Sequence, residues 1–164
     1  MREEAVDSKA IPAGKERMAS EVLNLELLIR KPPESVRAWW TDLPDDYVAK
    51  DPREQPYRIV TERKMQNGRE LRTYWRWPDG TTREAQEILS LKSDGSWTFE
   101  VPNGVGFRIV DEFRAESVPT GTKLIIRSTL TPLDHSAASR ISALKEFMIQ
   151  GWKDAAEICE RDAP

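Results

Sequence analysis

A stretch of short apolar segments separated by turn sequences, from about residue 57 to residue 132, constrains the fold more than any other feature. The segments cover 57–65, 69–77, 82–92, 96–101, 106–117 and 122–132. The separators QNG, PDG, SDG, PNG and VPTG supply the residue types that tight turns require. Strands joined by such short turns pair with their sequence neighbours, so the stretch predicts an antiparallel meander.

One more strand and a short helix are predicted before the meander. Residues 22–30 alternate apolar and polar side chains with period two, which is typical of a strand with one buried face. Pro32 and Pro33 end this strand and begin a helix, because the first helical turn does not need the N–H that proline lacks. Trp39 and Trp40 lie near the end of that helix.

A long helix is predicted after the meander, because the apolar period changes from two to 3.6 at residue 136 and stays so to about residue 161. Asp134 or Ser136 can cap its start. At 1.5 Å per residue the helix would be about 38 Å long, enough to cover the apolar face of a twisted sheet. The expected fold is therefore α+β, with a curved seven-stranded antiparallel sheet wrapped around a long C-terminal helix. The short helix after the first strand would close one end.

Composition excludes several classes of function. The chain has 164 residues and a net charge of -3 with mixed charges, which does not favour nucleic-acid binding. No apolar run has the roughly 18 residues of a membrane span, and residues 1–20 have no apolar signal core, so we expect a cytoplasmic protein without integral membrane association. Residues 1–20 read as a flexible tail and residues 21–164 as one domain.

Chemistry that depends on metals or phosphate groups is not indicated. A single histidine, His135, and a single cysteine, Cys159, exclude the usual zinc-ligand sets. The NGVG sequence is expected at a hairpin turn rather than between a strand and a helix, so no phosphate loop is predicted. We therefore expect neither a metal nor a cofactor.

The layout resembles the SRPBCC or START-like superfamily, the helix-grip fold shared by polyketide cyclases, aromatases and birch-pollen-type allergens. The resemblance covers about residues 21–161 and depends on the order of elements, on the closing GWKDAAEI and on the entry KPPESVRAWWTD. The matching residues of that entry are Pro32, Pro33, Glu34, Val36, Trp39, Trp40 and Asp42. The resemblance implies a cavity between the sheet and the long helix that holds a small hydrophobic or amphipathic molecule.

Period two and the helical stripe indicate which side chains would line such a cavity. They are Trp40, Thr73, Trp75, Trp97, Phe99, Asp111, Phe113, Ser128, Phe147, Met148, Gly151 and Trp152. Asp111 is the one carboxylate in an apolar row, with Trp97 expected opposite it on one side and Ser128 on the other. An inward Asp111 would have a raised pKa because burial disfavours the charged form.

The inward face of the strand 82–92 stays open at this stage. A strict two-residue turn at Asp94–Gly95 would turn Ile88 inward, whereas a bulged turn would turn Glu87 inward. An inward Glu87 would lie roughly 15 Å or more from Asp111, at ~3.3 Å rise and ~4.8 Å strand spacing, and would make a poor catalytic pair with it.

Three functions compete. The first is a carrier or sensor that binds a small hydrophobic molecule. The second, which the resemblance also permits, is a cofactor-independent enzyme of cyclase, aromatase or dehydratase type with Asp111 as its acid or base. The third is a protein-binding module that resembles the co-chaperone-like activators of the Hsp90 ATPase, which share the grip fold and a terminal Gly-Trp helix. The sequence leaves the oligomeric state open.

Overall fold

The computed structural model describes residues 19–41, 58–76, 82–104 and 106–164. Within these ranges the side chains of 58–62, 73–76 and 82–83 are not described. The flexible tail predicted over residues 1–20 therefore lies outside the described residues, apart from its last two positions.

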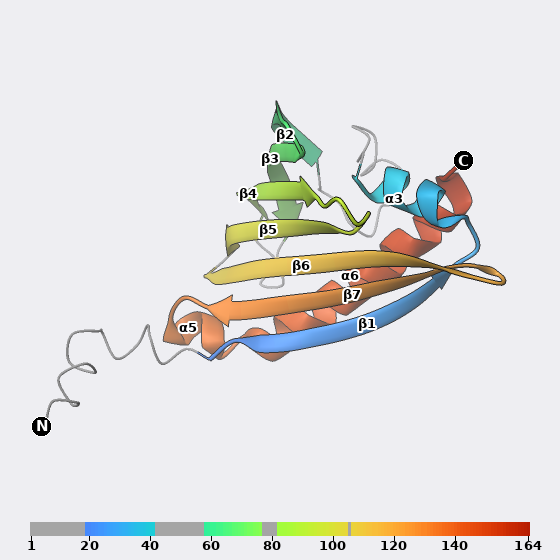
Figure 1. The fold of residues 1–164 in the computed structure, drawn as a ribbon. Helices are drawn as coiled ribbons and strands as arrows, with labels where there is room; N and C mark the ends of the chain where they lie inside the picture. Colours follow the sequence, from blue (N-terminus) through green and yellow to red (C-terminus); the bar gives the residue numbers. More distant parts are fainter. Residues whose placement is uncertain (1–18, 42–57, 77–81, 105) are drawn as a thin grey trace, which may run out of the picture.

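A single curved sheet and one long helix make up most of the described chain (Figure 1). The elements are β1 (Glu21–Ile29), α3 (Pro33–Thr41), β2 (Arg58–Met65), β3 (Gly68–Arg76), β4 (Thr82–Leu91), β5 (Trp97–Gly104), β6 (Phe107–Val118), β7 (Gly121–Pro132), α5 (His135–Ala138) and α6 (Ile141–Asp162). The seven strands follow the order β1-β7-β6-β5-β4-β3-β2, and every neighbouring pair is antiparallel. The predicted α+β helix-grip architecture is confirmed.

Helix α6 runs along β1 and behind the sheet as Figure 1 shows it. The Nζ of Lys145, near the start of α6, lies 2.9 Å from a carboxylate oxygen of Glu21 at the start of β1. Near the other end, Lys31 Nζ donates a hydrogen bond of 2.5 Å to the carbonyl oxygen of Ala163. These two contacts show that α6 runs parallel to β1.

Helix α3 closes the end of the sheet near the C-terminal end of α6 (Figure 1). Trp40 is buried, and its ring centroid lies 5.9 Å from that of Phe113 on β6. Trp39 is partly buried and packs against the same core. The prediction that the two tryptophans close one end of the trough is confirmed.

The single long helix predicted from residue 136 is interrupted. Asp134 caps α5, as expected, by accepting the backbone N–H of Ala137 at 2.8 Å. The helix then stops at Ser139, whose hydroxyl bonds to the carbonyl oxygen of Ser136, the same oxygen that accepts from Arg140 Nε. Side chains that bond to backbone carbonyls compete with continued helix, which explains the break before α6.

The turn between β4 and β5 decides which face of β4 points inward. Lys92 N–H bonds to Ser96 at 2.9 Å, which leaves a three-residue loop, and Gly95 has a φ of 89°. A three-residue hairpin with a left-handed glycine is the bulged alternative. Glu87 is therefore inward and buried, together with Leu89.

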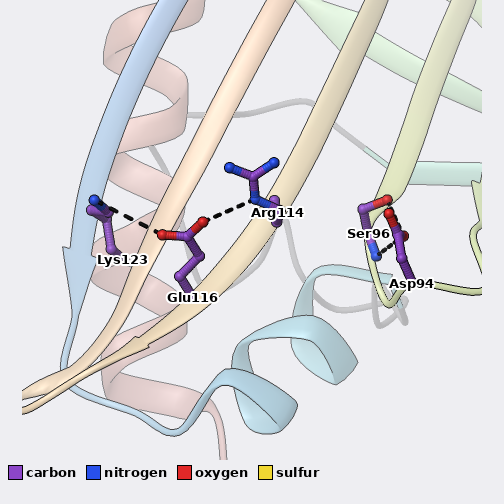
Figure 2. Close-up of polar contacts among 5 residues, drawn as sticks. All are labelled: Asp94, Ser96, Arg114, Glu116 and Lys123. Atoms are coloured by element: carbon purple, nitrogen blue, oxygen red, sulfur yellow. Dashed lines mark hydrogen bonds and ion pairs between the residues drawn. The ribbon is translucent and has the colours of Figure 1, made fainter.

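The outer face of the sheet carries ion pairs. Figure 2 shows Glu116 between Arg114 and Lys123, with nitrogen–oxygen distances of 3.0 and 3.9 Å. The same figure shows Asp94 accepting hydrogen bonds from Ser96 in the β4–β5 turn. Exposed pairs of this kind contribute little to stability, and they keep this face solvated.

Candidate functional site

The inner face of the sheet near α3 is filled by aromatic side chains. Phe113 lies at the centre, stacked on Trp97 at 5.5 Å and in contact with Phe99 at 6.1 Å and with Trp152 of α6 at 6.5 Å. Together with Trp40 these rings form what we call the aromatic cluster. Five of the predicted cavity residues are thus brought together, but they pack mainly against one another.

A second apolar cluster lies at the other end of the sheet, against α5 and the first turns of α6. It contains Phe107 and Ile109 of β6 and Leu130 of β7, with Leu144 and the partly buried Met148 from α6. We call it the distal cluster. The described core therefore consists of two apolar clusters rather than one continuous hydrophobic core.

Polar side chains separate these two clusters. Asp111 lies between Ile109 and Phe113 on β6, and Ser128 lies directly opposite it on β7. The Ser128 hydroxyl donates a hydrogen bond of 2.5 Å to Asp111 Oδ1. Glu87 belongs to the same inward face of β4 and is 5% exposed. We call Glu87, Asp111 and Ser128 the polar belt.

The pairing of β6 confirms one sequence prediction about Asp111 and corrects another. Ser128 is its partner on β7, as expected, but Phe99 and not Trp97 is its partner on β5. Strand β5 continues to Gly104, which pairs with Phe107, and the register shifts between Val101 and Gly104. The loop between β5 and β6 is therefore shorter than a loop at NGV would be. As a result, Trp97 pairs with Phe113, two residues beyond Asp111 on β6.

Glu87 also lies nearer to Asp111 than expected. Leu89 pairs with Phe99, which pairs with Asp111, and Glu87 is the next inward residue on β4. At ~4.8 Å per strand and ~3.3 Å per residue, the two Cα atoms are about 12 Å apart. Glu87 is the belt residue that sequence reasoning left undecided, and the three-residue SDG loop is the signal that would have identified it.

Burial raises the pKa of Asp111 to about 7, from an ordinary value of 3.8. Desolvation is the main cause, and the negative charge of Glu87 raises the pKa further. The hydrogen bond from Ser128 acts in the opposite direction, since it stabilises the carboxylate. The expectation of a raised pKa is confirmed, and Asp111 changes its charge near neutral pH.

Gly151 lies on a face of α6 whose neighbouring members pack against the sheet. Leu144, Met148, Gly151 and Ala155 share one helical face, and the first and last of these are buried against the sheet. A Cβ atom added to Gly151 would meet no atom of the described residues within 4 Å. Met148 and Gly151 are only half-buried, so the middle of the helix contacts the sheet less closely than its two ends do.

Asp111 differs in its residue exposure from the inward residues around it. Its inward neighbours Ile109, Phe113 and Ser128 are buried, with at most 3% exposure, whereas Asp111 itself is only partly buried. The carboxyl group itself is desolvated between the two apolar clusters, which is the main cause of its raised pKa. The indole Nε1 of Trp97, which is 0% exposed, has no hydrogen-bond partner among the described residues.

The remaining predicted cavity residues have different outcomes. Thr73 and Trp75 belong to β3, but their side chains lie outside the described part of the structure. Phe147 is half-buried on α6. Cys159, which is not among the predicted cavity residues, is buried on α6, and burial raises the pKa of its thiol to about 12.

Neither a metal-binding cluster nor a membrane-spanning helix is found among the described residues. The described residues contain no group of three or more His, Cys, Asp or Glu side chains placed to hold a metal ion. None of the described helices is long and apolar enough to cross a membrane.

Comparison with solved structures gives the class of fold. An aromatase/cyclase, Zhui of Streptomyces sp. R1128, superposes with a TM-score of 0.70 at 14% identity, over 87% of this chain and 95% of the other. A START superfamily protein from Mycobacterium smegmatis gives 0.61 at 12% identity, over 89% and 96%. The di-domain aromatase/cyclase BexL gives 0.66 at 12% identity over 88% of this chain, which spans half of the BexL chain.

No family model and no curated protein sequence matches the chain. Identities of this size establish the fold and nothing finer. The protein has the START-like helix-grip fold, as the sequence resemblance predicted.

Proposed function

We propose that the protein binds a small hydrophobic or amphipathic molecule between the sheet and α6. The observation that carries this proposal is the open space beside Gly151, on the helical face that otherwise packs against the sheet. A domain stabilised by packing alone would favour a side chain there, because glycine inside a helix costs about 1 kcal/mol relative to alanine. The apolar clusters on both sides suit apolar parts of a ligand, and the polar belt suits a polar group.

Native mass spectrometry of protein purified from its own host tests the proposal. We expect an added mass that disappears on denaturation. The matched variant is Gly151→Leu, which places a side chain in the open space, and it should carry less of the added mass while keeping the circular dichroism of the wild type. A wild-type protein with no added mass, and with no thermal shift on addition of apolar extracts, would contradict the proposal.

A second candidate function is an enzyme, and the titration of Asp111 favours it. A carboxyl group with a pKa of about 7 is balanced between its acid and base forms at neutral pH, which suits proton transfer. Several structures with this fold are described as aromatase/cyclases, and another is a norcoclaurine synthase. Loss of turnover in Asp111→Asn with ligand binding retained would support an enzyme.

The third alternative, a protein-binding module of the Hsp90-activator kind, would need only a solid core and an exposed surface. The absence of any described atom within 4 Å of a Cβ at Gly151 favours a ligand instead.

A further inference from the structure

We propose that the exposed edge of β1 is an interface at which two copies of this chain pair, so that their sheets join across a two-fold axis at Leu25. Strand β1 is the last strand on one side of the sheet, and β7 is its one partner among the described strands (Figure 1). The backbone N–H and C=O groups on the other side of an edge strand can pair with a further strand. The inference concerns the surface of the protein and does not depend on the proposed ligand site.

Strand β1 lacks the features that normally protect a sheet edge. Its nine residues pair with β7 in one continuous register, and its sequence EVLNLELLI contains no proline and no positive charge. The other edge strand, β2, differs, because its register with β3 shifts between Ile59 and Thr61 and it carries the exposed Arg63 and Lys64. Bulges and positive charges of this kind prevent edge-to-edge pairing in natural sheets. Of the two edges, the β1 edge is therefore the one open to another strand.

Apolar side chains are accessible on both faces of β1. On the outer face Val22 is 42% exposed and Leu28 is 68% exposed, and they are two of the three exposed large hydrophobic side chains of the described residues. On the inner face Leu23, Leu25 and Leu27 are only half-buried, although α6 runs along this strand. A second strand placed against the edge would remove apolar surface on both faces from water.

The sequence of β1 is symmetric about Leu25, its central residue. Antiparallel pairing that sets Leu25 opposite itself joins the other residues in three kinds of pair, each formed twice: Val22 with Leu28, Leu23 with Leu27, and Asn24 with Glu26. Apolar side chains therefore meet apolar side chains on both faces of the joined sheet. This agreement is what a two-fold interface requires, because the same surface must be complementary to itself.

The polar residues of β1 favour the same register. The Asn24 amide can donate a hydrogen bond to the Glu26 carboxylate of the second copy. A register with Leu25 opposite Leu27 would instead place Glu26 opposite its own copy, where like charges repel. The charged groups at the two ends of the strand have partners on α6, since Glu21 lies 2.9 Å from Lys145 and Arg30 lies 3.5 Å from Glu160.

Sedimentation equilibrium of the full chain over a range of concentrations tests the proposal. We expect a dimer, and Leu28→Lys should raise its dissociation constant at least about tenfold, because the two-fold axis places the new charge opposite Val22 at two positions. Leu28 is 68% exposed, so this variant should keep the circular dichroism of the wild type. Met65→Lys is the matched control, since Met65 is an exposed apolar residue of the other edge strand, and it should leave the dimer unchanged.

Two further experiments test the register. Val22→Glu alone should weaken the dimer, whereas Val22→Glu combined with Leu28→Lys places opposite charges across the interface and should recover most of the lost affinity. A mixture of the Asn24→Cys and Glu26→Cys variants should form a disulfide between chains on mild oxidation, because directly opposed residues lie within the reach of a disulfide. The native Cys159 is buried and should not take part.

Three outcomes would overturn the proposal. The first is a wild-type chain that stays monomeric at every concentration. The second is a dimer that Leu28→Lys leaves intact, or that Met65→Lys weakens equally, since the contact would then lie elsewhere. The third is a double variant as weak as Leu28→Lys together with no disulfide in the cysteine mixture, which would exclude pairing about Leu25.

Discussion

The charge of Asp111 should make the stability of the protein depend on pH in a way that a single substitution removes. In the unfolded chain the carboxyl has its ordinary pKa of 3.8, and in the folded protein its pKa is about 7. Between these values the folded protein holds a proton that the unfolded chain has released. The contribution of Asp111 to the free energy of unfolding is therefore fully present below pH 3.8 and falls as the pH rises through 7.

The size of this pH effect follows from the difference between the pKa values of Asp111 in the unfolded and folded protein. One pKa unit corresponds to about 1.4 kcal/mol, so the full shift amounts to at most about 4 kcal/mol. The Asp111→Asn variant keeps the size and polarity of the side chain but cannot ionise. Compared with the wild type, it should gain up to about 3 kcal/mol of stability between pH 4.5 and pH 8.5.

Urea denaturation followed by circular dichroism at several pH values measures this difference. Glu112→Gln is the control, because that carboxylate is exposed and paired with Arg127, and exposed pairs contribute little. If the wild type and Asp111→Asn show the same dependence on pH, Asp111 does not have a raised pKa, and its burial beside Glu87 has been misread.

Three further predictions concern other parts of the core. Gly151→Ala should raise the free energy of unfolding by about 1 kcal/mol, because the added methyl group meets nothing within 4 Å and alanine favours helix; an unchanged or lower urea midpoint would contradict this. Phe113→Ala should lower stability by about 3–5 kcal/mol, since its ring contacts four other aromatic rings, whereas a loss below 1 kcal/mol would show that the cluster is loose. Cys159, with a thiol pKa of about 12, should react with a thiol reagent at pH 8 only at the rate of unfolding, and rapid labelling of the native protein would show that the α6 face opens.

The fold was predictable because its signals are local. Turn sequences and period-two alternation defined the strands to within a few residues, and the pairing of Asp111 with Ser128 followed from the turn at 119–120. Features that depend on the detailed geometry of a turn could not be predicted from the sequence alone. Whether Glu87 points inward depends on the three-residue loop between β4 and β5. Which residue pairs with Trp97 depends on the register shift near Gly104. A one-residue difference in a loop reverses a whole strand face, so sequence periodicity alone could not decide these points.

The open space was not predictable for a different reason, since it depends on how far α6 stands from the sheet. The sequence showed only that Gly151 was unusual inside a helix and left open whether a neighbouring strand or a ligand required it. The structure shows no neighbouring strand within 4 Å of the position that a Cβ would occupy. Close backbone approach, the usual structural reason for a helical glycine, is therefore excluded for the described residues.

Asp111 and Gly151 are two positions where folding alone would favour another residue. A side chain that cannot ionise at 111 would avoid the cost of burying a charge, and alanine at 151 would stabilise the helix. The two positions belong to different elements, and both lie between the aromatic cluster and the distal cluster. Residues that lower stability without a structural reason concentrate where a protein binds or reacts. Two such residues, one carboxyl and one missing side chain, therefore support the same place for the proposed ligand. A stabilised double variant Asp111→Asn/Gly151→Ala that binds a host ligand as tightly as the wild type would refute that argument.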